Sequence, residues 1–247
     1  VPIGLVLGNH FGWRAPFVLI AFLTICLMIC IQYFMNRIQP APAVPITQQL
    51  RTLKSSKILA AHLAMFLFLA GHTTLYAYFT PFLKTIVGVS AAMVSVIYFI
   101  YGIAAISGGA IGGTLADRFG ARKVMIGVMT VFSLTMFIMA YTTFFFLFFL
   151  IIMIIWGMMS WTITPPMQNY LIDIAPETAA VQQSLSHSSL HFGIAFGSFM
   201  GGIIINHASV VQNAAWGSLL VLLALGSIIF SMQRHQKEQA ASIHEHA

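Results

Sequence analysis

The chain has 247 residues, of which 59% are hydrophobic and only 6% are Asp, Glu, Lys or Arg, and its formal net charge is +6. A soluble domain usually carries about 25% charged residues, so this composition excludes a water-soluble globular protein. It also argues against a nucleic-acid-binding surface, which would need clustered cations on a hydrated face. We therefore expect an integral membrane protein whose partner is the lipid bilayer and not a nucleic acid.

The first apolar residues of the chain are too few to cross a bilayer. A hydrocarbon core about 30 Å thick needs roughly 20 residues at 1.5 Å each, and VPIGLVLGNHFGWR is interrupted by Gly-Asn-His-Phe-Gly. We expect this stretch to be the end of a longer segment, and two interpretations stay open: a fragment of a longer protein, or a reading frame with an unusual start. The following run, residues 15–35, is the first full span. Its two cysteines, Cys26 and Cys30, are too few ligands for a metal site and are expected to be packing residues.

A connection without acidic residues separates the first span from the others. Residues 36–57 contain Pro40, Pro42 and Pro45, which favour an extended backbone between two groups of helices. Six more apolar runs follow. Backbone groups in lipid must be hydrogen-bonded internally, so these runs predict helices, and the fold class is an all-α protein with seven transmembrane helices and a polar tail, 233–247. The six runs cover residues 58–80, 91–113, 123–142, 143–164, 183–206 and 213–232.

Basic residues predict the orientation of these spans. Arg14 and Lys84 fall on one side of the bilayer, and the other nine Lys and Arg residues fall on the opposite side. The positive-inside rule places the side with nine in the cytoplasm, so the C-terminus is expected to be cytoplasmic. The nine residues are Arg37, Arg51, Lys54, Lys57, Arg118, Arg122, Lys123, Arg234 and Lys237.

Charge is concentrated in one short connection, GGTLADRFGARKV, residues 112–124. Glycines at 108, 109, 112 and 113 thin the preceding helix, so a neighbouring helix can approach closely. Gly120 permits a tight reversal, and we expect a loop of about nine residues. Asp117 and the nearby cations can pair with one another or with an adjoining helix end. Ordinary positive-inside anchoring remains the alternative.

This connection resembles a known signature. The pattern Gly113-x-x-x-Asp117-Arg118-x-Gly120-x-Arg122-Lys123 is similar to the G-x-x-x-D-R-x-G-R-[RK] loop of the major facilitator superfamily, with Ala121 in place of the usual basic residue. In that family the loop lies on the cytoplasmic side and acts in conformational change, and its second-half copy is commonly weaker.

Other segments resemble the same family and imply a position within it. The segment GxxxGxxxGWRxPF, from Gly4 to Phe17, is similar to the junction of helices five and six in that family. The segment from Ser188 to Ile205 is similar to the glycine-patterned eleventh helix of drug, sugar and purine efflux permeases of the proton-antiporter type. The resemblance implies the end of helix five and helix six (1–35), a central cytoplasmic loop (36–57), a C-terminal six-helix bundle (58–232) and a cytoplasmic tail. It also implies export of a small organic solute, coupled to protons, across the plasma membrane, with an N-terminal bundle as the missing partner.

Polar residues within the spans are candidates for the substrate cavity, because polar groups are costly in lipid and normally face protein or water. No span has an acidic or basic residue in its middle, so a proton-carrying carboxylate is expected outside this chain. The pair His187 and His191 lacks an evident third metal ligand, so we expect no metal and no cofactor. Candidate cavity residues are His72, Thr73, Tyr76, Trp156, Trp161, His187 and His191, and Gly193, Gly197 and Gly201 are expected to form a helix-packing seam.

Two other classes of protein were weighed against a transporter. An intact seven-helix receptor fits the number of spans and the topology, but the last span has no lysine for a retinal Schiff base. A membrane enzyme would need a catalytic group of residues at one depth. His187 with Ser184 or Ser188 is the nearest arrangement, and it lacks an orienting acid, so we expect no enzymatic activity.

Overall fold

The computed structural model describes residues 2–35, 45, 47 and 51–245, and these residues are almost entirely helical. Most of the predicted central loop 36–57, together with residues 246–247, lies outside the described residues. The helices are α1 (Pro2–Phe11), α2 (Ala15–Phe34), α4 (Ser56–Tyr76), α5 (Phe79–Phe82), α6 (Ala91–Phe119), α7 (Ala121–Met139), α8 (Phe146–Thr162), α9 (Thr164–Ile174), α10 (Ala179–His207) and α11 (Val210–Glu245), with a π-helical turn η1 (Leu83–Val87) and a 3-10 turn η2 (Pro176–Thr178).

Seven apolar helical stretches in the described part of the chain are long enough to cross a bilayer. They correspond to α2, α4, α6, α7, α8 with α9, α10 and α11, so the predicted all-α fold and the number of spans are confirmed. Large apolar side chains such as Phe99, Ile106 and Phe148 are exposed, as expected where the solvent is lipid.

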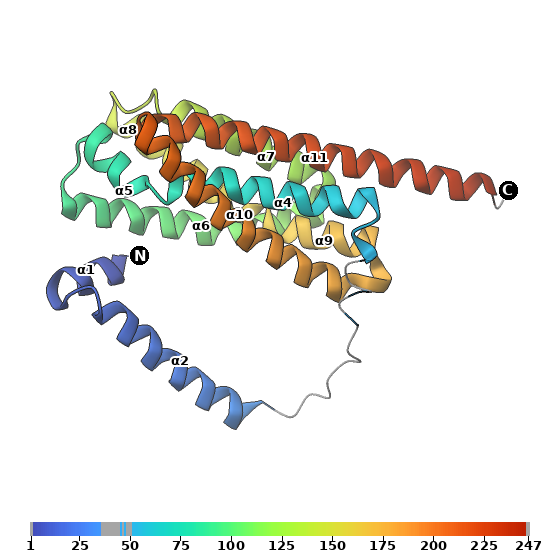
Figure 1. The fold of residues 1–247 in the computed structure, drawn as a ribbon, viewed down its shortest axis with the longest axis horizontal. Coiled ribbons are helices and arrows are strands. Elements are labelled where there is room, and N and C mark those ends of the chain that lie inside the picture. Colours follow the sequence, from blue (N-terminus) through green and yellow to red (C-terminus); the bar gives the residue numbers. More distant parts are fainter. Residues whose placement is uncertain (1, 36–44, 46, 48–50, 246–247) are drawn as a thin grey trace.

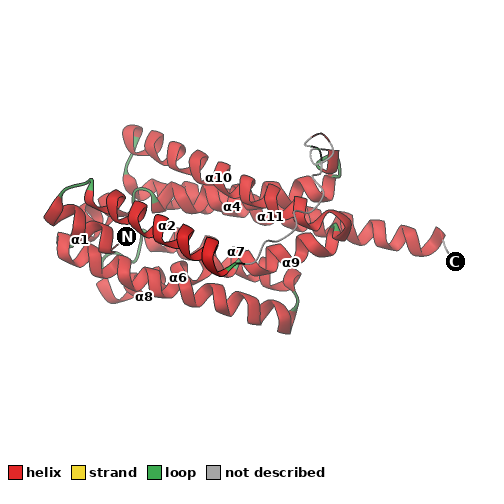
Figure 2. Ribbon diagram, turned by 90° about the horizontal axis from the view of Figure 1, so that it is seen from below, coloured by secondary structure: helices red, strands yellow, loops and turns green. Residues whose placement is uncertain are grey.

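The bundle is built around α4, which is the most buried of the spans. It packs against α10 and against α11, while α6 packs on α8 and α7 packs on α11 (Figures 1 and 2). At the centre, the rings of Phe68 and Phe132 lie 4.7 Å apart and are fully buried. No residue of α2 is buried, and Figure 1 shows this helix apart from the bundle.

Small residues set the spacing of the helices. Gly193, Gly197 and Gly201 of α10 lie directly against backbone carbonyls of α4, where any Cβ atom would overlap them. In α6, Gly108 and Gly112 face α8 in the same way, whereas Gly109 and Gly113 have open space beside them. Only one glycine of each adjacent pair therefore serves close packing between described helices.

Buried hydroxyl groups add polar ties between helices. Ser133 of α7 and Ser218 of α11 each donate to the other's backbone carbonyl, at 3.2 and 3.0 Å. Ser227 and Ser231 of α11 donate to carbonyls of α4 at 2.8 and 2.6 Å. His62 and Gln182 form a buried hydrogen bond of 2.9 Å between α4 and α10.

Several predicted boundaries were wrong. The reversal between α6 and α7 is not a loop of about nine residues but the single residue Gly120, whose φ of 85° lets the two helices follow one another directly. The predicted span 58–80 is interrupted after Tyr76, and α9 continues beyond the predicted end at 164. The residues of the predicted polar tail are helical as far as Glu245, because α11 continues into them.

Candidate functional site

A cavity of about 230 Å³ lies between α4, α6, the α8–α9 junction and α10. It is bounded by four aromatic side chains, with His72 counted among them, by three serine or threonine side chains and by three aliphatic side chains. No Asp, Glu, Lys or Arg is among the described residues that line it. The lining residues are Leu69, His72, Thr73, Tyr76, Tyr101, Ser160, Trp161, Thr164, Leu190 and Ile194.

Two of the surrounding helices break beside this cavity. α4 ends at Tyr76 and the chain resumes helical structure at Phe79. α8 ends at Thr162 and α9 begins at Thr164, where two prolines follow and remove two backbone donors. Irregular backbone at membrane depth is tolerated where it is buried in protein or lines a cavity, and discontinuous helices of this kind mark substrate sites in many transporters.

Hydrogen bonds order the polar side of the cavity. The Tyr101 hydroxyl donates to Ser160 Oγ at 3.2 Å, and Ser160 Oγ lies 2.6 Å from the Gly157 carbonyl, to which it donates. His72 Nε2 lies 3.5 Å from the Tyr101 oxygen. Because the tyrosine hydrogen is directed at Ser160, the imidazole must supply the hydrogen of this longer contact, which leaves Nδ1 as an acceptor. His72 Nδ1 has no partner among the described residues.

Aromatic rings pack closely around this chain of hydrogen bonds. His72 stacks on Tyr76 with ring centroids 5.1 Å apart, and Tyr76 lies 5.2 Å from Tyr101. Trp156 stands behind them, 5.2 Å from His72 and 5.1 Å from Tyr101, and is fully buried. These distances lie in the favourable range for aromatic pairs, so the rings hold one another in place.

The structure separates the predicted cavity residues into three groups. His72, Thr73, Tyr76 and Trp161 line the cavity. Trp156 supports it from behind without lining it. His187 and His191 lie on an exposed face of α10, where they border a different, open groove of about 600 Å³. No group of three or more possible metal ligands occurs among the described residues, so this histidine pair acquires no third ligand from them.

Sequence reasoning missed Tyr101, which connects His72 to Ser160. Tyr98 and Tyr101 are spaced three apart in a span otherwise dominated by aliphatic and small residues, and this spacing on one helix face was the available signal. Ser160 and Thr164 are likewise absent from the candidates selected from the sequence. Their contribution depends on the break between α8 and α9, which places them next to α4.

The charged signature lies at the α6–α7 junction. Asp117 and Arg118 occupy the last turn of α6, and Arg122 and Lys123 the first turn of α7. Arg122 forms an ion pair of 3.1 Å with Asp173 at the end of α9, whereas Asp117 is exposed and makes no ion pair with the described residues.

Further contacts surround this junction. His235 of α11 lies 3.9 Å from the same carboxylate of Asp173, and the Arg122 guanidinium sits over the Tyr170 ring at 5.9 Å. Lys57 at the start of α4 pairs with Glu238 of α11 at 2.7 Å. One end of the bundle is therefore joined by charged and aromatic contacts among α4, α7, α9 and α11.

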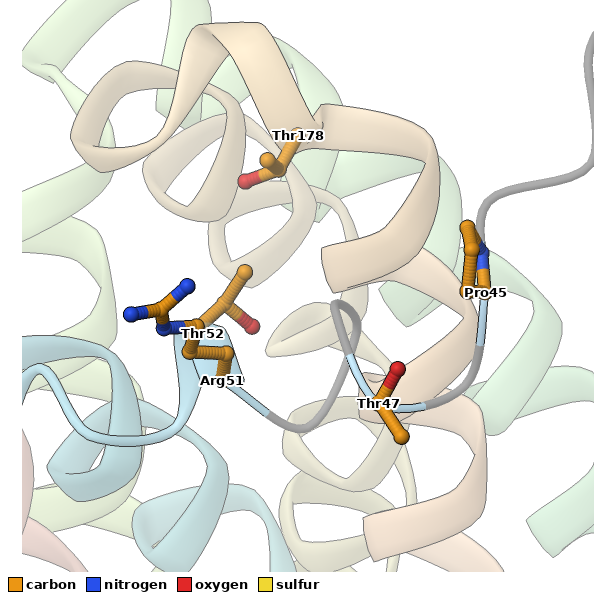
Figure 3. Close-up of a pocket in the computed structure, with 5 residues that line it drawn as sticks. All are labelled: Pro45, Thr47, Arg51, Thr52 and Thr178. Atoms are coloured by element: carbon orange, nitrogen blue, oxygen red, sulfur yellow. The ribbon is translucent and has the colours of Figure 1, made fainter.

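A larger hollow, about 530 Å³, lies at the start of α10 (Figure 3). It is bounded by Pro45, Thr47, Arg51 and Thr52 on one side and Thr178 on the other. It contains none of the predicted cavity residues and no aromatic ring. The cavity around His72 and Tyr101 is the better candidate, because it combines aromatic surface with ordered polar groups between helices.

Comparison with known proteins decides the family. The sequence pattern of the Major Facilitator Superfamily matches residues 61–245. The chain belongs to the major facilitator superfamily. This superfamily is one of multi-pass membrane transport proteins and not of enzymes, and the receptor alternative is not favoured.

Curated proteins similar to this chain carry names that agree with the family assignment. The chain is 29% identical over 238 residues to the "Uncharacterized MFS-type transporter YbcL" of Bacillus subtilis (strain 168). It is 26% identical over 255 residues to the "Uncharacterized MFS-type transporter YtbD" of the same organism, and 27% identical over 241 residues to the "Inner membrane transport protein YdhP" of Escherichia coli (strain K12). These alignments cover 96–97% of the chain but only 61–62% of each relative.

Proposed function

We propose that this chain forms the C-terminal part of a transporter that exports a small organic solute of the drug, sugar or purine class in exchange for protons. The observation that carries the proposal is the cavity beside the breaks in α4 and at the α8–α9 junction. In alternating access, two helical bundles rock around a central site, and broken helices next to that site provide the places where they bend. The corresponding proposed domains are the end of helix five with helix six in 1–35, a central loop in 36–57, a six-helix bundle in 58–232 and a tail in 233–247.

The proposed partner of this bundle is a second bundle that covers its open side. α10 presents an exposed face with His187, His191 and Phe192 beside the open groove. Polar and aromatic residues on one helix face fit a surface that meets protein and water better than one that meets only lipid. In this arrangement His187 and His191 would line the shared space between the bundles.

The proton step is assigned to a group outside the described cavity. No carboxylate lines the cavity among the described residues, and His72 is engaged with Tyr101 and Tyr76. His72 is therefore proposed as a substrate contact, together with Thr73, Tyr76 and Trp161. Trp156 is proposed to hold the rings of this site in position.

The charged end of the bundle is proposed to face the cytoplasm, with the protein in the plasma membrane. Lys57, Arg122 and Asp173 gather there, whereas Lys84 lies in η1 beyond the other end of α4. The Arg122–Asp173 pair joins α7 to α9, and so it is a contact that must adjust when α9 moves. This supports a conformational role for Gly113, Asp117, Arg118, Gly120, Arg122 and Lys123.

The test is solute-driven proton movement in liposomes. The product of the complete reading frame that contains this chain is reconstituted with a pH-sensitive dye inside the vesicles. Ethidium, lactose and hypoxanthine are added separately as representatives of the three solute classes. We expect at least one to move protons, and the 247-residue chain alone to move none. Solute flux without proton movement would contradict the coupling, and absence of any flux would contradict transport of these classes.

A further inference from the structure

Resting on the proposed function, we infer that the cavity binds an uncharged aromatic compound that carries an O–H or N–H donor. The ligand's chemistry is thereby specified in addition to the position of its site. It depends on three properties of the lining: the absence of charge, the aromatic walls, and the direction of the hydroxyl hydrogens.

The first property is the lack of a counter-charge. None of the described residues that line the cavity is acidic or basic, apart from the imidazole of His72. Aromatic faces attract a cation, but the gain is on the order of tenfold in affinity. Removing a full charge from water without an opposite charge costs on the order of a hundredfold or more. The balance therefore favours a neutral ligand over a cation and disfavours an anion still more.

The second property is the shape of the walls. The Tyr76 ring centroid lies 5.1 Å from that of His72 and 5.2 Å from that of Tyr101. Trp161, which also lines the cavity, remains 54% exposed. Leu190 and Ile194 add aliphatic surface from α10. A flat ring can stack on such walls, whereas a saturated ring of similar size loses the favourable aromatic geometry.

The third property is that three of the five hydroxyl groups in the lining, those of Thr73, Tyr101 and Ser160, already donate their hydrogens inside the protein. Thr73 Oγ1 donates to the Leu69 carbonyl at 2.7 Å, Ser160 donates to Gly157, and Tyr101 donates to Ser160. Each of these oxygens keeps acceptor capacity. This hydrogen-bonded group consequently offers acceptors to the cavity, and it is matched by a ligand that donates a hydrogen.

The test measures equilibrium binding to the purified chain in detergent with a matched set of probes. 2-Naphthol is compared with 2-methoxynaphthalene, which lacks the donor, and with decahydro-2-naphthol, which lacks the aromatic rings. 2-Naphthoate and a trimethylnaphthylammonium ion supply the anion and the cation. We expect saturable binding of 2-naphthol, about fivefold weaker binding without the donor, and at least tenfold weaker binding of the charged and saturated compounds.

Variants separate the cavity from partition into the detergent micelle. Tyr101→Phe keeps the ring and removes the acceptor oxygen, so it should weaken 2-naphthol binding three- to tenfold and leave 2-methoxynaphthalene unchanged. Tyr141→Phe is the matched control, because Tyr141 is exposed and does not line the cavity. The Tyr141→Phe variant should bind 2-naphthol as tightly as the unaltered chain does. Circular dichroism and thermal melting establish that each variant is folded.

Several results would overturn the inference. They are binding of either ion that equals or exceeds that of 2-naphthol, equal binding of 2-naphthol and 2-methoxynaphthalene, or no saturable binding of 2-naphthol to the folded chain. The transport proposal can fail independently of this inference. Selective 2-naphthol binding without any solute flux in liposomes would contradict transport but leave the inferred ligand chemistry intact. Flux of a permanently charged solute without 2-naphthol binding would contradict the inferred ligand chemistry but leave transport intact.

Discussion

Two neighbouring glycines in α6 allow the packing of α6 on α8 to be tested directly. A Cβ atom added at Gly108 would overlap the backbone carbonyl of Met158, which cannot move without shifting α8. The same atom added at Gly109 would meet nothing within 4 Å. We therefore expect Gly108→Ala to destabilise the protein and Gly109→Ala to leave it unchanged or slightly more stable.

The expected magnitude follows from three contributions. Overpacking at a tight contact costs about 1–3 kcal/mol. Separation of the helices also weakens the hydrogen bond from Thr162 Oγ1 to the Gly108 carbonyl, 3.0 Å long, worth about 0.5–1.5 kcal/mol. Replacing glycine by alanine within a helix stabilises the helix by about 1 kcal/mol, which offsets part of this loss. The net loss for Gly108→Ala is about 0.5–3.5 kcal/mol, against a gain of up to about 1 kcal/mol for Gly109→Ala.

The assay is reversible unfolding of the purified chain in mixed micelles by increasing SDS, followed by circular dichroism and tryptophan fluorescence. The two variants share the same chemical change and differ by one position, so helix propensity and detergent effects cancel in the comparison. We expect the midpoint of Gly108→Ala to fall clearly below that of Gly109→Ala. Equal midpoints, or the opposite order, would refute the close contact of α6 with α8 at this register.

Two further predictions concern the polar contacts. Ser133→Ala should lower the free energy of unfolding by about 1 kcal/mol in the same assay, and Ser218→Ala added to it should cost less than a second full increment, because the two residues share one reciprocal pair of hydrogen bonds. Full additivity would contradict that pairing. Arg122→Ala should change stability by less than about 1 kcal/mol, since its ion pair is exposed, yet it should slow solute-driven proton movement by the complete product. An unchanged rate of solute-driven proton movement would contradict the conformational role proposed for the Arg122–Asp173 pair.

Much of the architecture followed from composition and periodic runs of apolar residues. The seven spans were found because a bilayer demands about 20 apolar residues for each helix, a requirement that is local in sequence. The errors arose where helices do not end with their apolar runs. Asp117 and Arg122 looked like residues of a loop, but charged residues are equally stable in the last and first turns of helices at a membrane surface, and one glycine is enough to reverse the chain.

The cavity was only partly predictable. His72, Thr73 and Tyr76 could be selected because polar residues are rare in lipid and stand out in an apolar span. His187 looked equally suitable, and yet it lies on the exposed face of α10, because the register of α10 is set by where its glycines meet α4. The sequence shows which residues are polar, but it does not show which helix face is turned toward α4.

Sequence alone determined that this protein lies in a membrane, how many helices cross it, and which short stretch carries its charge. These properties depend on residues close together in the chain. The tertiary structure decided that Tyr101 of α6 joins His72 of α4 and Ser160 of α8 in one hydrogen-bonded group, and that Arg122 pairs with Asp173. Such contacts join residues 29 to 59 positions apart, and they exist only because the glycine seams and helix breaks bring those helices into register.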